Sequence, residues 1–307
     1  MATTRWNVYF NGKESFRKGQ ELIAQNHAED FDKLFPVYLE NDIKARETAS
    51  SAMERAVNKA VKAIELHSIT AKPKRKKGKR ESEKYREFRR KKEYNNMIDE
   101  CYLLLGKSQF YRREYYSTER TFRYILREFK DYPIYYEAAI WYARTLGEQN
   151  KYFRALRTLK DIMEEEGFPE KLIPMARTAK ADCYIRRGLY DKAIEELDFL
   201  AKNTKKSQGQ TRYYYLLAQL HTLQGNIEKA QATYADLVAT HPEYDYAFHA
   251  KLTKALLYGQ YNLAESETKV KSELRKLIRD RRNKEYLDQV YYTLAKLYEK
   301  ADDTDKA

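Results

Sequence analysis

The stretch "YYLLAQLHTLQGNIEKAQATYADLVATHP", from Tyr214 to Pro242, holds two helical patterns joined by a short turn. Apolar residues recur at helical spacing before Gly225, among them Leu217, and again after it, among them Tyr234. Gly225 suits the end of the first helix because it tolerates a left-handed backbone. Pro242 ends the second helix because proline cannot continue the hydrogen-bond ladder. The stretch therefore predicts a helix–turn–helix unit.

The same unit recurs along the chain. The turn motif Gly-x-x-x-x-Ala appears as "GNIEKA" from Gly225 and as "GLYDKA" from Gly188, 37 residues earlier. A further copy, "NKYFRA", starts at Asn150, and Asn replaces Gly because it also tolerates a left-handed helix end. Before it, "RREYYST" puts Thr118 at the Ala position. A period of this length indicates a helical-repeat protein.

These units resemble the tetratricopeptide repeat. The resemblance covers roughly residues 97–307, as about five whole units and one cut short. It implies an all-α fold, a tetratricopeptide-repeat superhelical solenoid with a concave and a convex face. The bulk composition agrees, because Gly (10) and Pro (6) are scarce and Tyr (28) is common. Tyr suits thin two-layer arrays, since its ring is buried while its hydroxyl stays in water.

Composition divides the chain into three expected segments. Residues 1–68 form an N-terminal helical cap or degenerate repeats, 69–93 a basic linker and charged helix, and 94–307 the tetratricopeptide repeats, the last of them truncated. Within the cap we expect a short helix ending at Asn11-Gly12. A long amphipathic helix follows further on, and one stripe of it carries small and apolar residues: Ala52, Ala56, Ala60, Ala63 and Ile64.

The basic segment carries most of the excess charge. Residues 72–93 contain thirteen Lys or Arg and four Glu, a net of +9, while the whole chain is +13. This pattern fits nucleic acid, an anionic membrane surface or an acidic protein partner, and it equally fits a solvated linker before a charged helix. Only Tyr85 and Phe88 are interleaved aromatics, and their spacing suits packing on a neighbouring helix, so no nucleic acid is expected. We expect the run 72–80 to be mobile.

No catalytic or cofactor motif is present in the sequence. HExxH, CxxC, GxSxG and Gly-rich phosphate loops are all missing, so we expect neither an enzyme nor a cofactor or metal site. Cys101 and Cys183 fall in helical patterns and are expected to be buried free thiols. His221 occupies a normally apolar repeat position, which favours a packed side chain over a ligand. No run of about 18 apolar residues occurs.

Two stretches carry a narrower resemblance. The first is "RWNVYFNGKESFRKGQELI" with "DFDKLFPVY" and "MERAVNKAVKAIELHSI", and the second is "YNNMIDECYLLLGKSQFYRREYYSTERTFRYILREFKDYP". Together they resemble the N-terminal region of the PorW/SprE family of tetratricopeptide lipoproteins of Bacteroidetes. The family resemblance implies a periplasmic, outer-membrane-associated lipoprotein required for type IX secretion and, in gliding relatives, for gliding motility. The lipidated Cys that it implies has no counterpart in this sequence.

The last residues repeat only half of a unit. "YYTLAKLYEKADDTDKA", from Tyr291 to Ala307, matches the first helix and turn of the 214–230 stretch and then stops. Its residues Tyr291, Leu294, Leu297 and Tyr298 would lack the cover of a second helix, whereas natural arrays end in a polar cap. We therefore expect this sequence to be the N-terminal part of a longer protein.

The leading hypothesis is a non-enzymatic scaffold that binds protein partners. The resemblance implies that it links the periplasmic PorK/PorN-type ring to the outer-membrane translocon, with a membrane contact only through a lipid anchor. Alternatives are a cytosolic tetratricopeptide adaptor or co-chaperone, or an RNA-associated repeat protein using the basic run. The ninth residue of each unit usually lines the concave face, and those residues are mixed in character: Lys107, Arg144, Asp182, Gln219, Thr253 and Lys296. The net charge adds the expectation that the partner is acidic.

Overall fold

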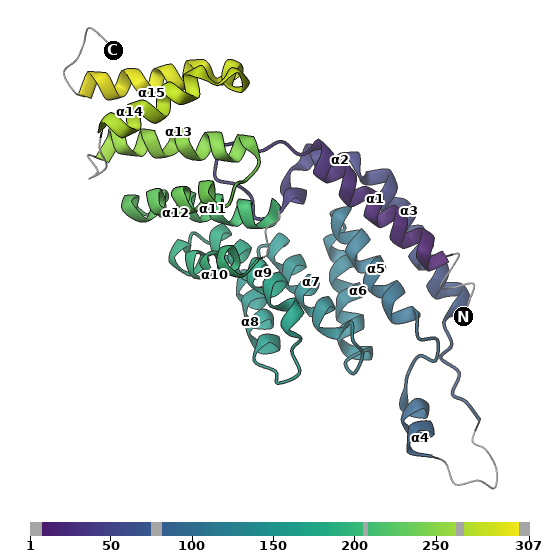
Figure 1. Ribbon diagram of the computed structural model, residues 1–307. Coiled ribbons are helices and arrows are strands. Elements are labelled where there is room, and N and C mark those ends of the chain that lie inside the picture. Colours follow the sequence, from purple (N-terminus) through teal and green to yellow (C-terminus); the bar gives the residue numbers. More distant parts are fainter. Residues whose placement is uncertain (1–7, 75–81, 205–207, 262–266, 301–307) are drawn as a thin grey trace. The chain divides into compact units, whose positions relative to one another are not determined.

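The computed structural model describes residues 8–74, 82–204, 208–261 and 267–300. Within these ranges the regular elements are fifteen α-helices and short 3-10 turns, with no strand (Figure 1). The chain divides into two compact units. The N-terminal unit comprises residues 1–28 and 38–183, and the C-terminal unit comprises residues 29–37 and 184–307. The expected all-α, helical-repeat fold is confirmed.

Successive helices of the N-terminal unit pack against one another. Its helices are α1 (Phe10–Asn26), α2 (Ile43–Thr48), α3 (Ser50–His67), α4 (Glu83–Arg90), α5 (Ile98–Tyr111), α6 (Tyr115–Glu128), α7 (Tyr135–Glu148) and α8 (Tyr152–Met163). Helix α3 packs on α1 and α5, and the series continues through α6, α7 and α8. The boundary between the units falls within α9 (Ile173–Arg186).

The C-terminal unit continues the pattern of helix pairs. Its helices are α10 (Tyr190–Asn203), α11 (Gln208–Leu223), α12 (Ile227–Ala239), α13 (Tyr244–Tyr261), α14 (Glu267–Arg279) and α15 (Leu287–Lys300). Each of α10 to α13 packs on the next, and α15 packs on both α13 and α14. Leu297 and Tyr298 of α15 are therefore buried and Leu294 is half-buried, whereas Tyr291 is 53% exposed, so the predicted lack of cover was wrong for Leu297 and Tyr298 but holds for Tyr291. Residues 301–307, including Ala307, lie outside the described residues.

The repeat turns share one backbone geometry. The residue at the predicted turn position has a positive φ in four repeats: +64° at Arg113, +60° at Asn150, +69° at Gly188 and +73° at Gly225. The next residue donates its backbone N–H to the carbonyl five residues back, for example Asn226 to His221 at 2.9 Å. This is the helix-ending motif that a left-handed residue permits. The prediction that Asn150 substitutes for Gly is confirmed.

The small residue that follows each turn is completely buried. The predicted Ala positions have no exposed surface: Thr118, Ala155, Ala193 and Ala230. A larger side chain there would hold the two helices of the unit apart, because packed interiors leave few voids. Burial of these four residues explains why the motif recurs with so little variation.

The N-terminal helices differ from one detail of the sequence analysis. The chain does not end a helix at Asn11-Gly12, because α1 continues through both residues. Gly12 is buried, and a Cβ there would meet Leu104 at 3.0 Å. The glycine therefore serves a close helix contact and not a turn. The predicted alanine stripe on α3 is confirmed, since Ala52, Ala56, Ala60 and Ala63 are all buried.

The basic segment is described only in part. Residues 75–81 lie outside the described residues, and with them most of the run expected to be mobile. Helix α4 has no buried residue. Phe88 packs edge-to-face on Tyr94 with a ring separation of 5.1 Å, so its aromatic contact is a residue that follows α4 and not a neighbouring helix. The expected boundaries at residues 68 and 93 remain predictions of composition.

Candidate functional site

The six residues predicted to line the concave face lie on the first helices of their units, but most of them already have intramolecular contacts. They are Lys107 on α5, Arg144 on α7, Asp182 on α9, Gln219 on α11, Thr253 on α13 and Lys296 on α15. Arg144 and Asp182 are buried, whereas Lys296 is exposed. The contacts of Arg144 and Gln219 involve residues of the connection between α1 and α2, and they define the two clusters described next.

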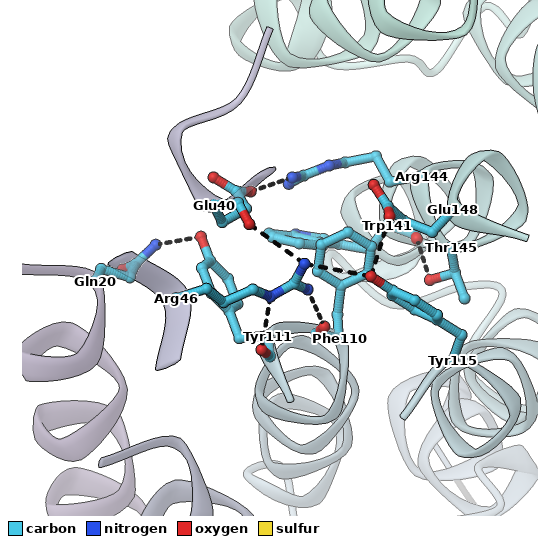
Figure 2. Close-up of polar contacts among 10 residues, drawn as sticks. All are labelled: Gln20, Glu40, Arg46, Phe110, Tyr111, Tyr115, Trp141, Arg144, Thr145 and Glu148. Carbon is cyan, nitrogen blue, oxygen red and sulfur yellow. Dashed lines mark hydrogen bonds and ion pairs between the residues drawn. The ribbon is translucent and has the colours of Figure 1, made fainter. Parts of the chain in front are cut away.

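In the N-terminal unit, Arg144 lies among aromatic rings and pairs with one carboxylate, that of Glu40 (Figure 2 draws the pair). Its guanidinium carbon lies 3.8 Å from the ring centre of Tyr38 and 4.0 Å from that of Trp141. Its Nη2 pairs with the Glu40 carboxylate, and both side chains are at most 10% exposed. Burial alone would lower the pKa of Arg144, but Tyr38 and Glu40 raise it overall. A cation between aromatic faces, neutralised by a buried acid, is a fixed structural arrangement.

Arg46 forms the other half of this charged cluster (Figure 2). Its Nε donates to the Tyr111 carbonyl at 2.7 Å, and its Nη2 donates to the Phe110 carbonyl. These carbonyls belong to the last turn of α5, where backbone oxygens lack partners within the helix. A buried cation at a helix C-terminus also complements the helix dipole. Arg46 further donates to the hydroxyl of Tyr115 at 3.2 Å, which in turn donates to Glu148 at 3.0 Å.

Lys107 lies beside the same cluster. Its Nζ pairs with Glu137, and it lies 5.7 Å from the centre of the Trp141 ring. Two cations of this region are therefore matched by carboxylates, Lys107 by Glu137 and Arg144 by Glu40, whereas Arg46 binds backbone carbonyls and a hydroxyl. We refer to Glu40, Arg46 and Arg144 with Tyr38 and Trp141 as the charged cluster.

In the C-terminal unit, Gln219 binds the backbone of an extended segment, Glu29–Val37. The Phe35 backbone N–H donates to the Gln219 carbonyl oxygen at 3.0 Å, and the Gln219 amide nitrogen donates to the Lys33 carbonyl at 2.7 Å. A carboxamide carries one acceptor and two donors, so it can pair with a peptide backbone in both directions. Gln219 therefore recognises the main chain of a non-helical polypeptide and not its side chains.

Two phenylalanines of the segment lie against rings from α11 and α13. Phe31 stacks on His249 with ring centres 3.8 Å apart and planes 10° apart. Phe35 stacks on Tyr215 at 4.7 Å and 15°. Tyr246 contacts both phenylalanines edge-on. Burial lowers the pKa of His249 and raises the pKa of Tyr215 to about 12, so both rings are neutral at physiological pH.

Charged groups hold both ends of the segment. At its start, Arg212 pairs with the Glu29 carboxylate at 2.8 Å, and the Tyr246 hydroxyl donates to the same carboxylate at 2.7 Å. Burial, followed by the hydrogen bond to Glu29, raises the pKa of Tyr246. Near its end, Arg212 Nη2 donates to the Pro36 carbonyl at 2.7 Å. We refer to Arg212, Tyr215, Gln219, Tyr246 and His249 as the aromatic site.

The remaining predicted residues contribute less to these clusters. Thr253 on α13 interacts with the Tyr215 side chain and acts to lower its pKa, so it lies beside the aromatic site. Asp182 is buried on α9. Lys296 pairs with Glu299, at 3.0 Å, on an exposed surface. The structure thus gathers Gln219 and Thr253 in one site and Lys107 and Arg144 in another.

A basic groove lies along the second helix of the first repeat. It has a volume of about 880 Å³, is lined on α6 by Arg120, Arg123 and Arg127, and also receives Tyr102 and Tyr142. Arg127 pairs with Glu128 at 2.5 Å. Within the described part of the chain, no carboxylate pairs with Arg120 or Arg123, and both are exposed. These side chains are free to attract an anionic surface, unlike Lys107 and Arg144.

Among the described residues, no group of three or more His, Cys, Asp or Glu is placed to hold a metal ion. His221 is buried and burial lowers its pKa, which agrees with a packed side chain. Cys101 and Cys183 are buried free thiols, as predicted, and burial raises the pKa of Cys101 to about 12. None of the described helices is both long enough and apolar enough to span a bilayer.

Sequence reasoning missed the occupant of these sites. No intramolecular contact was predicted for "EDFDKLFPVYLE", residues 29–40. One signal was available on the receiving helix, because Arg212 and Tyr215 lie seven and four residues before Gln219 and so share its helix face. No comparable pattern indicates which part of the chain fills that face.

Comparison with known proteins supports the repeat assignment. Residues 211–240 match the family model of the tetratricopeptide repeat. This stretch is a tetratricopeptide repeat. It contains Arg212, Tyr215 and Gln219, so three of the five residues of the aromatic site lie in a recognisable repeat. Among curated protein sequences, a search gave no significant match.

Solved structures resemble the chain in fold. The apo form of the quorum sensor NprR from B. thuringiensis aligns with 97% of this chain and 84% of its own, with a TM-score of 0.51 and 14% identity. Apo RapI covers 94% and 81%, with a TM-score of 0.48 and 14% identity. A tetratricopeptide repeat protein from Parabacteroides merdae covers 92% and 98%, with a TM-score of 0.41 and 14% identity. At this identity the similarity to NprR establishes the helical-repeat fold alone.

Proposed function

We propose that this chain is a non-enzymatic scaffold whose helical repeats bind protein partners. The observation that supports this most strongly is the pair of hydrogen bonds from Gln219 to the backbone of Lys33 and Phe35. A repeat face that holds one extended polypeptide by its main chain has the chemistry needed to hold another. Repeat arrays also present long continuous surfaces, which suit protein partners better than small molecules.

We further propose the setting that the sequence resemblance implies. The stretch "RWNVYFNGKESFRKGQELI" and the repeat-containing stretch from residue 94 support a role like that of the PorW/SprE family. In that role the chain belongs to a periplasmic lipoprotein at the outer membrane and connects a PorK/PorN-type ring to the translocon of type IX secretion. The basic groove at Arg120 and Arg123 supports an acidic contact region on the partner.

The test is chemical cross-linking and recovery of the chain from cells of its own source, with the bound proteins identified by mass spectrometry. We expect ring or translocon proteins among them, and fewer of these after Arg120→Glu and Arg123→Glu. Lys296→Glu is the matched control, because Lys296 is exposed but lies outside the groove. Recovery of no secretion protein would contradict the type IX role. Equal recovery after the groove reversals would exclude the groove as the contact.

A further inference from the structure

The extended segment Glu29–Val37 has the geometry of a bound peptide. It has no helix or strand of its own, and residues 29–35 contain one internal backbone hydrogen bond, from Lys33 N–H to the Asp30 carbonyl. Residues 30–33 form a turn closed by that hydrogen bond, in which Asp30, Asp32 and Lys33 are exposed. After the turn, Phe35 and Val37 are buried while Leu34 and Pro36 are half-buried, as expected of a short extended stretch that directs every second side chain toward a surface.

The contacts that hold the segment do not depend on the chain connection to α1. Gln219 and Arg212 bind three backbone groups: the Phe35 N–H and the carbonyls of Lys33 and Pro36. Any extended polypeptide presents the first two of these groups. Main-chain hydrogen bonds with separate side-chain subsites are the usual means by which proteins bind extended peptides.

Three subsites give the aromatic site its selectivity. Arg212 and the Tyr246 hydroxyl receive a carboxylate, here that of Glu29. The face of His249 receives an aromatic ring two residues later, and the face of Tyr215 receives another six residues after the carboxylate. The required pattern is therefore an acidic residue, two aromatic residues at those spacings, and freely varying residues where Asp30, Asp32 and Lys33 are exposed.

We propose that the aromatic site is a peptide-binding site for such a segment of a partner protein, and that Glu29–Val37 is a tethered ligand which the partner displaces. The inference rests on the proposed scaffold function and adds to it the chemistry of the partner and a threshold for binding. A tethered ligand acts at a high effective concentration, so only a partner with higher intrinsic affinity, or with a second contact elsewhere, replaces it. Weak or incidental aromatic peptides are thereby excluded.

The experiment uses a labelled synthetic peptide, "AEDFDKLFPVY", identical to residues 28–38. It is titrated into the full chain and into the full chain carrying Phe31→Ala and Phe35→Ala, and binding is followed by fluorescence anisotropy. We expect the double variant to bind the peptide at least about tenfold more tightly than the wild type, because its own segment no longer competes. The same peptide with both phenylalanines replaced by alanine should bind neither protein.

Further variants place the peptide on the proposed surface. Adding Gln219→Leu to the double variant should weaken peptide binding about tenfold or more, while adding Lys296→Ala, elsewhere in the same unit, should not change it. Circular dichroism first establishes that each protein is folded. If the double variant does not fold, the milder Phe35→Leu replaces it, and the peptide with its native phenylalanines should still bind more tightly than to wild type.

Three results would overturn the proposal. One is a folded double variant that binds the peptide no better than wild type does. The second is tight binding that Gln219→Leu leaves unchanged. The third is concentration-dependent dimerisation of the wild type that the added peptide disrupts, since the natural occupant would then be a second copy of this chain. Each of these results is independent of whether secretion proteins are recovered from cells, so the failure of one proposal can be told from the failure of the other.

Discussion

The charged cluster and the aromatic site hold two parts of the chain between α1 and α3 by different chemistry. Residues 38–46, which include the start of α2, are held by ions that are almost completely buried, as in the pairing of Arg144 with Glu40. Residues 29–37 are held mainly by stacked rings and by a carboxamide bound to the backbone. Buried ion pairs are strongly destabilising to break but do little to attract a new ligand, whereas ring stacking and main-chain hydrogen bonds can be exchanged between similar ligands. The charged cluster therefore anchors the chain, and the aromatic site suits the exchange of one bound segment for another.

The largest expected effect is on the anchor. Glu40→Gln leaves the buried Arg144 cation without a counter-charge, and we expect the free energy of unfolding of the N-terminal unit to fall by about 3–5 kcal/mol. Urea unfolding followed by circular dichroism measures it. Glu299→Gln is the control, because that carboxylate pairs with Lys296 on an exposed surface and should contribute almost nothing. A loss similar to that of the control would show that the cluster does not anchor the chain.

A smaller loss is expected at the aromatic site. Phe35→Leu keeps an apolar side chain but removes the stack on Tyr215, and it should lower the stability of the C-terminal unit by about 1–2 kcal/mol. Hydrogen exchange over α11 and α13 measures the change locally. Phe153→Leu is the matched control, since Phe153 is 74% exposed and its replacement should be neutral. If Phe35→Leu destabilised the protein more than Glu40→Gln, the assignment of anchor and exchangeable part would be reversed.

Acidification should affect the two units in opposite directions. Burial raises the pKa of Asp99 in the N-terminal unit to about 6, so the folded state binds its proton more readily than the unfolded state does. That unit should therefore gain about 1 kcal/mol between about pH 7.5 and about pH 5, because the folded carboxyl becomes protonated.

In the C-terminal unit, burial lowers the pKa of His249 and of His221, and for His249 the nearby Asp245 and Asp32 act in the opposite sense. The unfolded state then binds protons more readily, so the stability of this unit should fall as the pH drops below about 6.5. Hydrogen exchange at both pH values measures each unit separately. Asp99→Asn should abolish the gain, and His249→Gln should reduce the loss. If acidification changed the stability of both units in the same direction, and did so equally in both variants, the roles assigned to Asp99 and His249 would be contradicted.

The smallest effect concerns the repeat turns. Arg113 has a φ of +64°, which disfavours a side chain, whereas Gly225 occupies the equivalent turn without that strain. Arg113→Gly relieves the strain but increases the freedom of the unfolded chain, and the net gain should be about 0.5–1 kcal/mol. Thermal unfolding measures it. Gly225→Ala should cost a similar amount, and a stabilising Gly225→Ala would show that φ does not control these turns.

The repeat turns were predictable from sequence because each depends on a few adjacent residues. Asn150 in place of Gly, and the buried small residue five positions later, follow from local backbone geometry. The end of α1 was not predictable in this way. A glycine at position 12 suggests a helix end from local sequence. Its role instead comes from close packing against Leu104, which is more than ninety residues away in sequence.

The partners of the candidate site residues were not predictable from the sequence. The repeat pattern predicted that Gln219 and Arg144 lie on the first helices of their units, and these helices are α11 and α7. It could not indicate that Gln219 meets the backbone at Lys33 and Phe35, because a main-chain contact leaves no signature in the residues that it binds. Likewise, the partner of Arg144 is Glu40, which lies outside the repeats and has no periodic relation to them.

The placement of Trp141 within the charged cluster has a practical consequence for spectroscopy. The chain has two tryptophans: Trp141 belongs to the N-terminal unit and Trp6 lies outside the described residues, while the residues of the C-terminal unit include tyrosine but no tryptophan. Excitation at the red edge of the absorption band selects indole over phenol. The tryptophan emission of the intact protein therefore reports on one unit. Because Trp141 lies 4.0 Å from the Arg144 cation, its emission wavelength is sensitive to that charge. Events at the tyrosine-rich aromatic site can then be followed with a separate dye, without spectral overlap.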